Sequence, residues 1–393
     1  MYNETMLALG QAPSAIRELF AYGARRKAEI GTDAVFDFSI GNPSVPTPQA
    51  VTRAIVEATQ DDPVKVHAYT QSPGDPVARQ AVADSLNRRF GTSYTAQNLY
   101  LSCGAAASIS MTLKALIEPG DEIAVIAPFF PEYRVWVETH GATLTVIPAC
   151  SSDFQLDFKA LEQAITSRTK ALIINTPNNP VGVVYPRASL ERLADLLRQK
   201  SLEAGHPIFL ISDEPYRELV YGGLEVAWVP SLYDDTIVCY SWSKCLSLPG
   251  ERIGFVLVPP AAHESRQIMA AVSGAGRALG FICAPALFQR VIAACVDEPA
   301  QTAIYEENRR LLTDMLDELG FEYVNPDGAF YLWVRALEAD AQAFSDRART
   351  HELLLVPSDS FGSHGWVRLS YCIDAQVIKN SKDAFAALMA DYR

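Results

Sequence analysis

The chain has 393 residues, of which 49% are hydrophobic and 20% charged, and its formal net charge is -13. This length allows a large core spread over roughly two or three domains, and the composition excludes a disordered or fibrous protein. An acidic chain without a block of Lys and Arg is a poor partner for nucleic acid. Because no uninterrupted apolar stretch reaches about eighteen residues and residues 1–10 lack a secretory pattern, we expect a cytoplasmic protein without membrane contacts.

The seven cysteines are scattered and form no CxxC pair. This pattern favours reduced, mostly buried thiols over a disulfide framework, and we expect no metal site. Cys245 lies beside Lys244 and is open to two interpretations, a nucleophile or a small core residue, of which we favour the second.

The chain begins with a mixed-charge helical pattern over residues 11–30 and an alternating, strand-like run over residues 35–40. Residues 41–48 then contain three prolines within six residues and exclude a helix. They are either a boundary between an N-terminal piece and the main domain or a plain linker. Helical patterns follow over residues 49–59 and 77–90, and the loop between them carries Tyr69.

Between residues 98 and 258 short apolar runs alternate with helical patterns, which is typical of an α/β domain with a largely parallel sheet. We expect strands over residues 98–101, 122–126, 171–174, 208–211, 236–240 and 253–258. The carboxyl ends of strands in such sheets form the ligand crevice. Residues suited to chemistry follow five of these strands, and we expect them to converge: the turn at 104–106, Phe130, Asn179, Asp213 and Lys244.

Each of these features also has a plainer interpretation. Small residues at 104–108 either bind a phosphate at a helix N-terminus or allow close packing, and Phe130 either stacks on a flat ring or fills the core. Asp213 is either a helix cap or a ligand-binding carboxylate. A lysine beside two serines is usually a loop residue. However, Lys244 directly follows a strand and has Arg252 nearby, which suits an amine that attacks a carbonyl.

Beyond residue 260 the pattern changes to helices over 263–272 and 303–319 and to strand-like runs over 329–334, 353–356 and 366–371. Such a mixture predicts a smaller α+β domain. Residues 274–280 imitate a glycine-rich dinucleotide turn, but a helical pattern precedes them and the glycine spacing misses the fingerprint. A nicotinamide-dependent oxidoreductase is therefore disfavoured.

The chain resembles the class I/II aminotransferases, pyridoxal-phosphate enzymes of fold type I, in an ordered set of motifs: Asn179-Pro180-Val181-Gly182, Asp213-Glu214-Pro215-Tyr216, Ser241-Trp242-Ser243-Lys244, Arg252 and Arg368. The resemblance extends from the turn at Gly41 to the strand at Arg368. It implies a large α/β domain, with a mostly parallel seven-stranded sheet between helices, and a smaller α+β domain built from both chain ends. We expect the small domain in residues 1–47 and 291–393 and the large cofactor-binding domain in residues 48–290.

The resemblance also implies pyridoxal 5′-phosphate as the cofactor and a role for each matched residue. Lys244 would hold the cofactor as a Schiff base and later move a proton between substrate and cofactor. Asp213 would pair with the ring nitrogen, Asn179 and Tyr216 would donate to the ring oxygen, and Phe130 would stack on the ring. The phosphate would be held by Gly104, Ala105, Ala106, Ser241, Ser243 and Arg252. Ala106 would contribute only its backbone, because the family more often has a longer polar side chain there.

For the substrate, the resemblance implies that Arg368 binds the α-carboxylate in a bidentate fork, aided by the backbone of Gly41 and by Asn179. Arg277 lies where some members supply a second arginine for a side-chain carboxylate, although its spacing to Ala284-Pro285 differs slightly from that pattern. Tyr69 matches a tyrosine that reaches the phosphate of the neighbouring subunit, which implies a homodimer.

The sequence thus predicts an aminotransferase that works by a two-stage, ping-pong exchange through a pyridoxamine form, with 2-oxoglutarate as one partner of the exchange. The amino donor is left open between an acidic amino acid, such as aspartate or glutamate, and alanine or an aromatic amino acid. One alternative is a pyridoxal-phosphate-dependent C–S β-lyase, which releases a side-chain leaving group. Another is a non-catalytic cofactor-binding regulator, which the lack of a basic patch disfavours.

Overall fold

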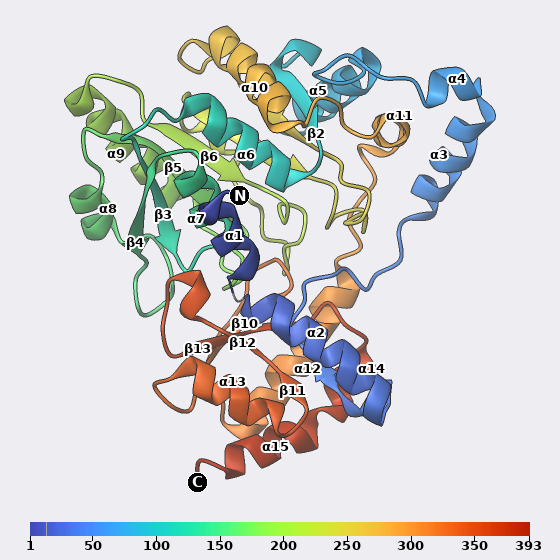
Figure 1. The fold of residues 1–393 in the computed structure, drawn as a ribbon, viewed down its shortest axis with the longest axis vertical. Coiled ribbons are helices and arrows are strands. Elements are labelled where there is room, and N and C mark those ends of the chain that lie inside the picture. Colours follow the sequence, from blue (N-terminus) through green and yellow to red (C-terminus); the bar gives the residue numbers. More distant parts are fainter. Residues whose placement is uncertain (13) are drawn as a thin grey trace. The chain divides into compact units, whose positions relative to one another are not determined.

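The computed structural model describes residues 1–12 and 14–393. The chain divides into two compact units (Figure 1). Unit 1 consists of Met1–Asn42, Tyr305–Pro326 and Phe330–Arg393, and unit 2 of Pro43–Ile304 and Asp327–Ala329. Unit 1 is therefore assembled from both ends of the chain. Residues 291–304 belong to unit 2, where helix α11 (Ala286–Cys295) packs on α3 (Gln49–Gln60) and α5 (Pro76–Phe90), whereas the sequence analysis placed them in the small domain.

Unit 2 is built on a seven-stranded sheet with the strand order β2-β8-β7-β6-β5-β3-β4. Its strands are β2 (Leu99–Ser102), β3 (Glu122–Ala127), β4 (Thr143–Pro148), β5 (Thr169–Asn175), β6 (Phe209–Asp213), β7 (Thr236–Ser241) and β8 (Gly254–Leu257). The five strands from β7 to β4 pair in parallel, while β8 is antiparallel to both β7 and β2. Because β2 and β7 both oppose β8, β2 points the same way as the parallel strands. The predicted mostly parallel, seven-stranded sheet is confirmed.

Helices cover both faces of this sheet, which is why its central strands read as continuous apolar runs. Adjacent residues of a strand point to opposite faces, and in β2 Tyr100 joins a core with α6 and α10, whereas Leu99 and Leu101 join a core with α3, α5 and α11. The remaining helices of unit 2 are α4 (Pro63–Val66), α6 (Ala105–Leu116), α7 (Glu132–Thr139), α8 (Phe158–Ala164), α9 (Arg187–Ala204) and α10 (Ser265–Leu279).

Local signals explain where several helices begin and end. Helix α5 starts with Asp75 as its cap and Pro76 in its first turn, and Gly91 ends it in the left-handed conformation, with φ +65°. Helix α10 instead runs through the glycine-rich stretch at 274–280 almost to its end. The helical backbone there agrees with the expectation that this stretch is not a dinucleotide turn. Gly276 has a packing reason, because a β-carbon at this position would lie 2.7 Å from the Tyr100 hydroxyl.

Unit 1 contains a four-stranded antiparallel sheet with the order β12-β13-β10-β9 and a two-stranded parallel pair, β1-β11. The strand expected over residues 353–356 is thus split between two sheets. The strands are β1 (Phe36–Asp37), β9 (Tyr323–Val324), β10 (Tyr331–Arg335), β11 (Leu353–Leu354), β12 (Val356–Pro357) and β13 (Trp366–Ser370). Its helices are α1 (Glu4–Gln11), α2 (Ala15–Ile30), most of α12 (Ala303–Leu319), α13 (Ala341–Arg349), α14 (Ala375–Asn380) and α15 (Lys382–Ala390).

The helix expected over residues 11–30 is represented by α2, which Ser14 caps through its side chain. Residue 13, inside that expected range, lies outside the described residues. Short 3-10 turns lie at Thr32–Ala34, Ala96–Asn98, Val229–Ser231 and Asp359–Phe361. Across residues 1–12 and 14–393, no helix combines the length and the apolar character needed to cross a membrane.

Candidate active site

The residues predicted to carry chemistry in unit 2 follow strands that all end at the same edge of the sheet. Asp213 is the last residue of β6, and Lys244 comes three residues after β7. In the paired register Asp213 stands beside Asn175 of β5 and Cys239 of β7. The fold therefore brings the predicted residues of unit 2 to one edge of the sheet: Gly104, Phe130, Asn179, Asp213 and Lys244.

Asp213 is buried, and only one of its two carboxylate oxygens has a hydrogen-bond partner among the described residues. The Tyr133 hydroxyl donates to Oδ2, and Asn175 Nδ2 lies 3.4 Å from the same oxygen and 2.9 Å from the main-chain oxygen of Asp213. Oδ1 is buried and has no hydrogen-bond partner among the described residues. Such an acceptor is costly unless a ligand supplies a donor. The side chain thus fits a ligand that presents an N–H or O–H to Oδ1.

The environment of Asp213 raises its pKa to about 7. Burial is the largest cause, because it disfavours the charged form, while the hydrogen bond from Tyr133 acts in the opposite direction and Glu214 adds a smaller upward effect. A cationic donor at Oδ1 would restore the carboxylate. This is the behaviour required of a group that keeps a ring nitrogen protonated.

Tyr133 is a site residue that the sequence analysis missed. It lies in the first turn of α7, is 2% exposed, and its ring packs edge-on against the half-buried Phe130 at a centroid distance of 5.8 Å. Burial, and then the charge of Asp213, raise its pKa well above the usual range, so its hydroxyl keeps the proton that it donates. The available signal was a tyrosine three residues after the expected stacking aromatic, which on a helical turn lies on the same side.

Lys244 lies close to Tyr216 in unit 2. Its Nζ is 5.9 Å from the centre of the Tyr216 ring, and Tyr216 is 5% exposed. In the same segment the hydroxyl oxygens of Ser241 and Ser243 are 2.7 Å apart, and the Ser243 N–H donates to Ser241 Oγ at 3.1 Å. A compact turn with two hydroxyls therefore precedes the lysine.

Cys245 is buried, and burial raises the pKa of its thiol far above the usual range. A neutral, enclosed thiol is a poor nucleophile. The structure thus favours the interpretation of Cys245 as a core residue.

The turn before α6 is shaped for close approach of an anion. Gly104 caps α6 with φ +86°, a conformation that suits glycine, and a β-carbon there would lie 2.8 Å from a guanidinium nitrogen of Arg252. Ala105 and Ala106 open the helix, where free N–H groups and the helix dipole favour a negative ligand. Backbone donors and one guanidinium therefore meet at this turn.

A second group of predicted site residues lies within unit 1. Arg368 of β13 is 2% exposed, donates to the Ser39 main-chain oxygen at 2.7 Å, and has its guanidinium carbon 4.5 Å from the centre of the Tyr331 ring. A β-carbon on Gly41 would lie 2.0 Å from the Tyr331 hydroxyl, so glycine is required there. The sequence analysis identified Gly41 and Arg368 and missed Tyr331, which connects them.

Tyr69 and Arg277 stand apart from these groups. The Tyr69 side chain is 99% exposed, and Arg277 is exposed in the last turn of α10. Among the residues described in this single chain, neither side chain is buried against the others predicted to bind the cofactor.

The side chains of unit 2 fit pyridoxal 5′-phosphate on their chemistry. Asp213 Oδ1, which has no partner among the described residues, suits a ring N–H. Lys244 supplies a primary amine from the end of β7, the strand next to the one that ends at Asp213. The turn at Gly104, with Arg252 beside it, suits a phosphate. A β-carbon at position 104 would fill part of the space that such a group needs.

Comparison with known proteins also supports a site for pyridoxal 5′-phosphate. The family model described as aminotransferase class I and II matches residues 33–385. A relative from Thermus aquaticus, named probable aspartate/prephenate aminotransferase, is 31% identical over 370 residues, which is 92% of each chain. A solved amino transferase from Eubacterium rectale has a TM-score of 0.98 and 50% identity, covering 100% of this chain and 99% of its own. The aspartate aminotransferase from Thermus thermophilus with maleate has a TM-score of 0.87 and 26% identity, covering 99% and 100%.

The family match extends over most of the chain, and the predicted motifs of unit 2 lie at one edge of its seven-stranded sheet. The protein is therefore a member of the class I and II aminotransferases, a transaminase that uses pyridoxal 5′-phosphate.

Proposed function

We propose that this transaminase takes the amino group of an acidic L-amino acid, aspartate or glutamate, and passes it to a 2-oxo acid, with 2-oxoglutarate as one partner of the exchange. The observation that carries the transamination site is the buried Asp213, whose Oδ1 lacks a partner within the described residues. Support for an acidic substrate comes from Arg277 and from two related proteins, one named for aspartate and prephenate and one solved with maleate, a dicarboxylate.

The cofactor, when bound, supplies an electron sink that weakens the bonds at the substrate Cα. Lys244 would attach the cofactor through its amine and then carry the proton that leaves and returns at the substrate. Asp213 would accept from the ring nitrogen through Oδ1 and so keep that nitrogen protonated. Asn179 and Tyr216 would donate to the ring oxygen, and Phe130 would pack on the ring face.

The phosphate would be bound by the N–H groups at residues 104–106, by the hydroxyls of Ser241 and Ser243, and by the Arg252 guanidinium. These groups would orient the ring and keep it from rotating while Lys244 acts. In unit 1, Arg368 and the backbone of Gly41 would bind the α-carboxylate that all amino acid substrates share. Unit 2 would thus serve as the cofactor-binding domain and unit 1 as the smaller domain.

We further propose a homodimer in which Tyr69 completes the phosphate site of the neighbouring subunit. The 99% exposure of the Tyr69 side chain in the single chain supports this assignment, because it leaves the ring accessible to a second subunit.

A panel of the twenty amino acids tests the proposed function. Purified protein loaded with pyridoxal 5′-phosphate should absorb visible light, and aspartate or glutamate without an acceptor should bleach that absorption. 2-Oxoglutarate should then restore it. A colourless protein, or one that no amino acid bleaches, would contradict the transaminase mechanism. Release of pyruvate and ammonia from a thioether amino acid would point instead to a C–S β-lyase.

Arg277→Ala tests the side-chain preference. If Arg277 binds the side-chain carboxylate, the KM for aspartate should rise on the order of tenfold or more, because a hydrogen-bonded ion pair is lost, while the KM for alanine stays the same. Arg266→Ala is a matched control, since Arg266 is also an exposed arginine of α10. Equal KM values for aspartate in Arg277→Ala and Arg266→Ala would exclude this role.

A further inference from the structure

Two neighbouring segments of unit 2 carry the groups that the proposed function needs closest together. Asp213 is the last residue of β6, the segment after β6 contains Tyr216, and the segment after β7 contains Lys244. The ring of Tyr216 and the amine of Lys244 are held 5.9 Å apart. A lysine in a loop needs such a constraint, because its flexible four-carbon side chain can adopt many rotamers. Without the constraint, the amine would occupy several different positions.

A cluster of four side chains joins these two segments through direct contacts; we name it the Tyr240 cluster, and it consists of Arg89, Glu218, Tyr240 and Cys245. The Tyr240 hydroxyl donates to Glu218 Oε2 at 2.9 Å and lies 3.1 Å from the Cys245 sulfur. Glu218 Oε1 accepts from Arg89 at 2.8 Å. Glu218 comes two residues after Tyr216, and Cys245 comes directly after Lys244, so the cluster links the backbones that carry both site residues.

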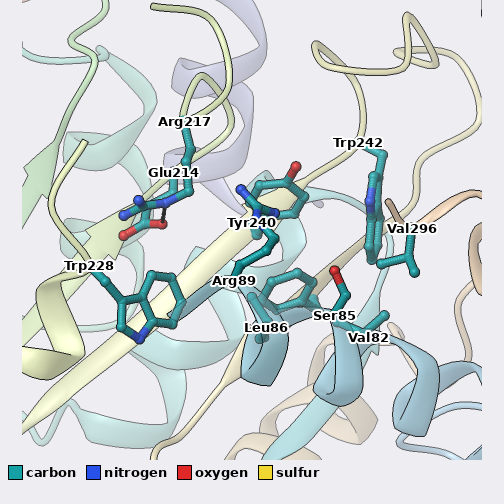
Figure 2. Close-up of a pocket in the computed structure, with 11 residues that line it drawn as sticks. Val82, Ser85, Leu86, Arg89, Glu214, Arg217, Trp228, Tyr240, Trp242 and Val296 are labelled. Carbon is teal, nitrogen blue, oxygen red and sulfur yellow. Dashed lines mark hydrogen bonds and ion pairs between the residues drawn. The ribbon is translucent and has the colours of Figure 1, made fainter. Parts of the chain in front are cut away.

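The surroundings of the Tyr240 cluster make the hydrogen bond of its buried Tyr240 hydroxyl hard to replace by water. Tyr240 is 5% exposed, and the Glu218 side chain is 18% exposed. Figure 2 shows Tyr240, Trp242 and Arg89 around a narrow cavity that α5 residues such as Leu86 also line. The Tyr240 hydroxyl, if it lost its partner, would have little access to water as a substitute, whereas the Arg89–Glu218 contact is partly open to solvent, with Arg89 37% exposed.

The ring of Tyr240 is anchored independently of its hydroxyl. It stacks on Phe255 at a centroid distance of 4.9 Å and meets Trp242 edge-on at 5.4 Å. Tyr240 also pairs with Phe255 in the β7–β8 register. The hydroxyl group is therefore the part of Tyr240 that serves the link between the two segments.

Burial raises the pKa of Tyr240 well above its ordinary value, with the nearby Cys245 and Glu218 adding to the effect, so the phenol remains a donor. Burial likewise keeps the Cys245 thiol neutral. Arg89 balances the charge of Glu218. The four groups thus form a neutral, satisfied set in which one hydroxyl bridges two site-bearing segments.

We propose that Tyr240 is a positioning residue for Lys244: its hydroxyl, by binding Glu218 and contacting Cys245, holds the lysine segment in register with Tyr216. This inference rests on the proposed role of Lys244 and Tyr216 in cofactor binding. A purely structural tyrosine would stabilise the fold without affecting the cofactor. The two alternatives therefore differ in what happens to cofactor binding when stability is matched.

Tyr240→Phe removes only the hydroxyl, and Tyr94→Phe is the matched control. Tyr94 is also a buried tyrosine, 7% exposed, and its hydroxyl accepts from Trp228 Nε1 at 3.1 Å, outside the Tyr240 cluster. In Tyr240→Phe the affinity for pyridoxal 5′-phosphate should fall on the order of tenfold, and the pH midpoint of the bound cofactor's visible absorption should move. In Tyr94→Phe both should stay at the wild-type values. Unfolding midpoints of both variants verify that they are folded.

A double-variant cycle with Glu218→Ala adds an independent readout. If the hydroxyl acts through Glu218, the double variant should bind the cofactor no more weakly than the weaker of the two single variants. Cys245→Ala, which removes only the thiol contact, should give a smaller change in the same direction and serves if Tyr240→Phe does not fold.

Identical cofactor affinity and pH midpoint in Tyr240→Phe, Tyr94→Phe and the wild type would overturn the positioning role, as would fully additive effects in the cycle. The proposed function is tested separately by the wild-type protein. If the wild type shows no visible absorption with pyridoxal 5′-phosphate, the proposed site is wrong. If it does, and only the variants fail to differ, the inference about Tyr240 alone is wrong.

Discussion

Asp213 shows how one residue can be prepared for its ligand by an unfavourable environment. Burial pushes its pKa to about 7, the Tyr133 hydroxyl pulls in the opposite direction, and Oδ1 stays without a partner in the described part of the chain. A free carboxyl in such a place is costly to ionise. The protein without cofactor therefore holds Asp213 in a state that a cationic ring nitrogen would relieve.

This environment predicts a pH-dependent stability for the cofactor-free protein. The pKa of Asp213 is raised in the folded state, from 3.8 to about 7, so the native state binds an extra proton between these values. The stabilisation that this proton brings is fully present below about pH 4 and is lost as the pH rises through about 7, by up to about 4 kcal/mol. Asp213→Asn should remove this contribution, so the stability of the variant relative to the wild type should rise between about pH 4 and pH 7 and level off above that.

Urea unfolding of both cofactor-free proteins at several pH values measures this difference. Other carboxylates act equally in both chains and cancel in the comparison. Parallel pH profiles for Asp213→Asn and the wild type would show that the pKa of Asp213 is close to its ordinary value.

At the scale of elements, the segment after β6 owes its shape to a buried ion pair. Arg217 is 5% exposed, and its Nε donates to the fully buried Glu214, whose Oε1 also accepts from Ser212 Oγ at 2.7 Å. The other guanidinium nitrogens donate to the main-chain oxygens of Val226 and Ala227 at 3.0 and 2.9 Å. Figure 2 shows the pair beside Trp228. The ion pair thus ties the residues next to Asp213 to the main chain nine and ten residues after Arg217.

Replacing only Arg217 should lower the free energy of unfolding much more than replacing both members of the ion pair. Arg217→Met leaves the Glu214 charge buried without its partner and should lower the free energy of unfolding by about 3–5 kcal/mol. The double variant Glu214→Gln with Arg217→Met should recover a large part of this loss, because no unpaired charge remains. Urea unfolding midpoints provide the measurement.

The control for this comparison is Arg310→Met in α12, which removes an exposed pair with Glu307 and should leave stability nearly unchanged. If Arg217→Met is as stable as the double variant, other groups compensate the buried charge of Glu214 and Arg217 is not needed for that purpose.

At the scale of the whole molecule, the site residues of a single chain leave Tyr69 exposed. If two subunits share their active sites, each site combines Lys244 of one subunit with Tyr69 of the other. The Lys244→Ala homodimer should be nearly inactive, and the Tyr69→Ala homodimer should have weakened transaminase activity. Mixed dimers of the two variants, however, contain one site in which both residues are intact.

We therefore expect that co-refolding or co-expressing Lys244→Ala with Tyr69→Ala restores activity well above that of either variant alone. The size of the assembly in solution should be measured in the same samples. No restoration in a verified mixed dimer would place Tyr69 outside the active site of the neighbouring subunit.

Much of the fold could be predicted because its signals are local. Strand β3 was expected over residues 122–126 and spans Glu122–Ala127, and the helix expected over 303–319 is α12 (Ala303–Leu319). In contrast, β4 (Thr143–Pro148) was missed, since it is an edge strand with exposed positions and no continuous apolar run. Helix α10 extends beyond its expected end, because packing of Gly276 against Tyr100 outweighs the weak helix propensity of glycine.

The sequence by itself determined the family, the polar residues that follow each apolar strand along the chain, and the residue types suited to the cofactor. These features could be predicted because apolar runs and motifs extend over only a few neighbouring residues. Only the tertiary structure decided which of these groups meet. The contact between Tyr133 and Asp213 joins residues 80 positions apart, and that between Arg368 and Ser39 spans 329. Such pairs depend on strand order and on which face each side chain occupies, so no local pattern specifies them. The same holds for the Tyr240 hydroxyl, whose partner Glu218 comes from the turn that follows the neighbouring strand β6.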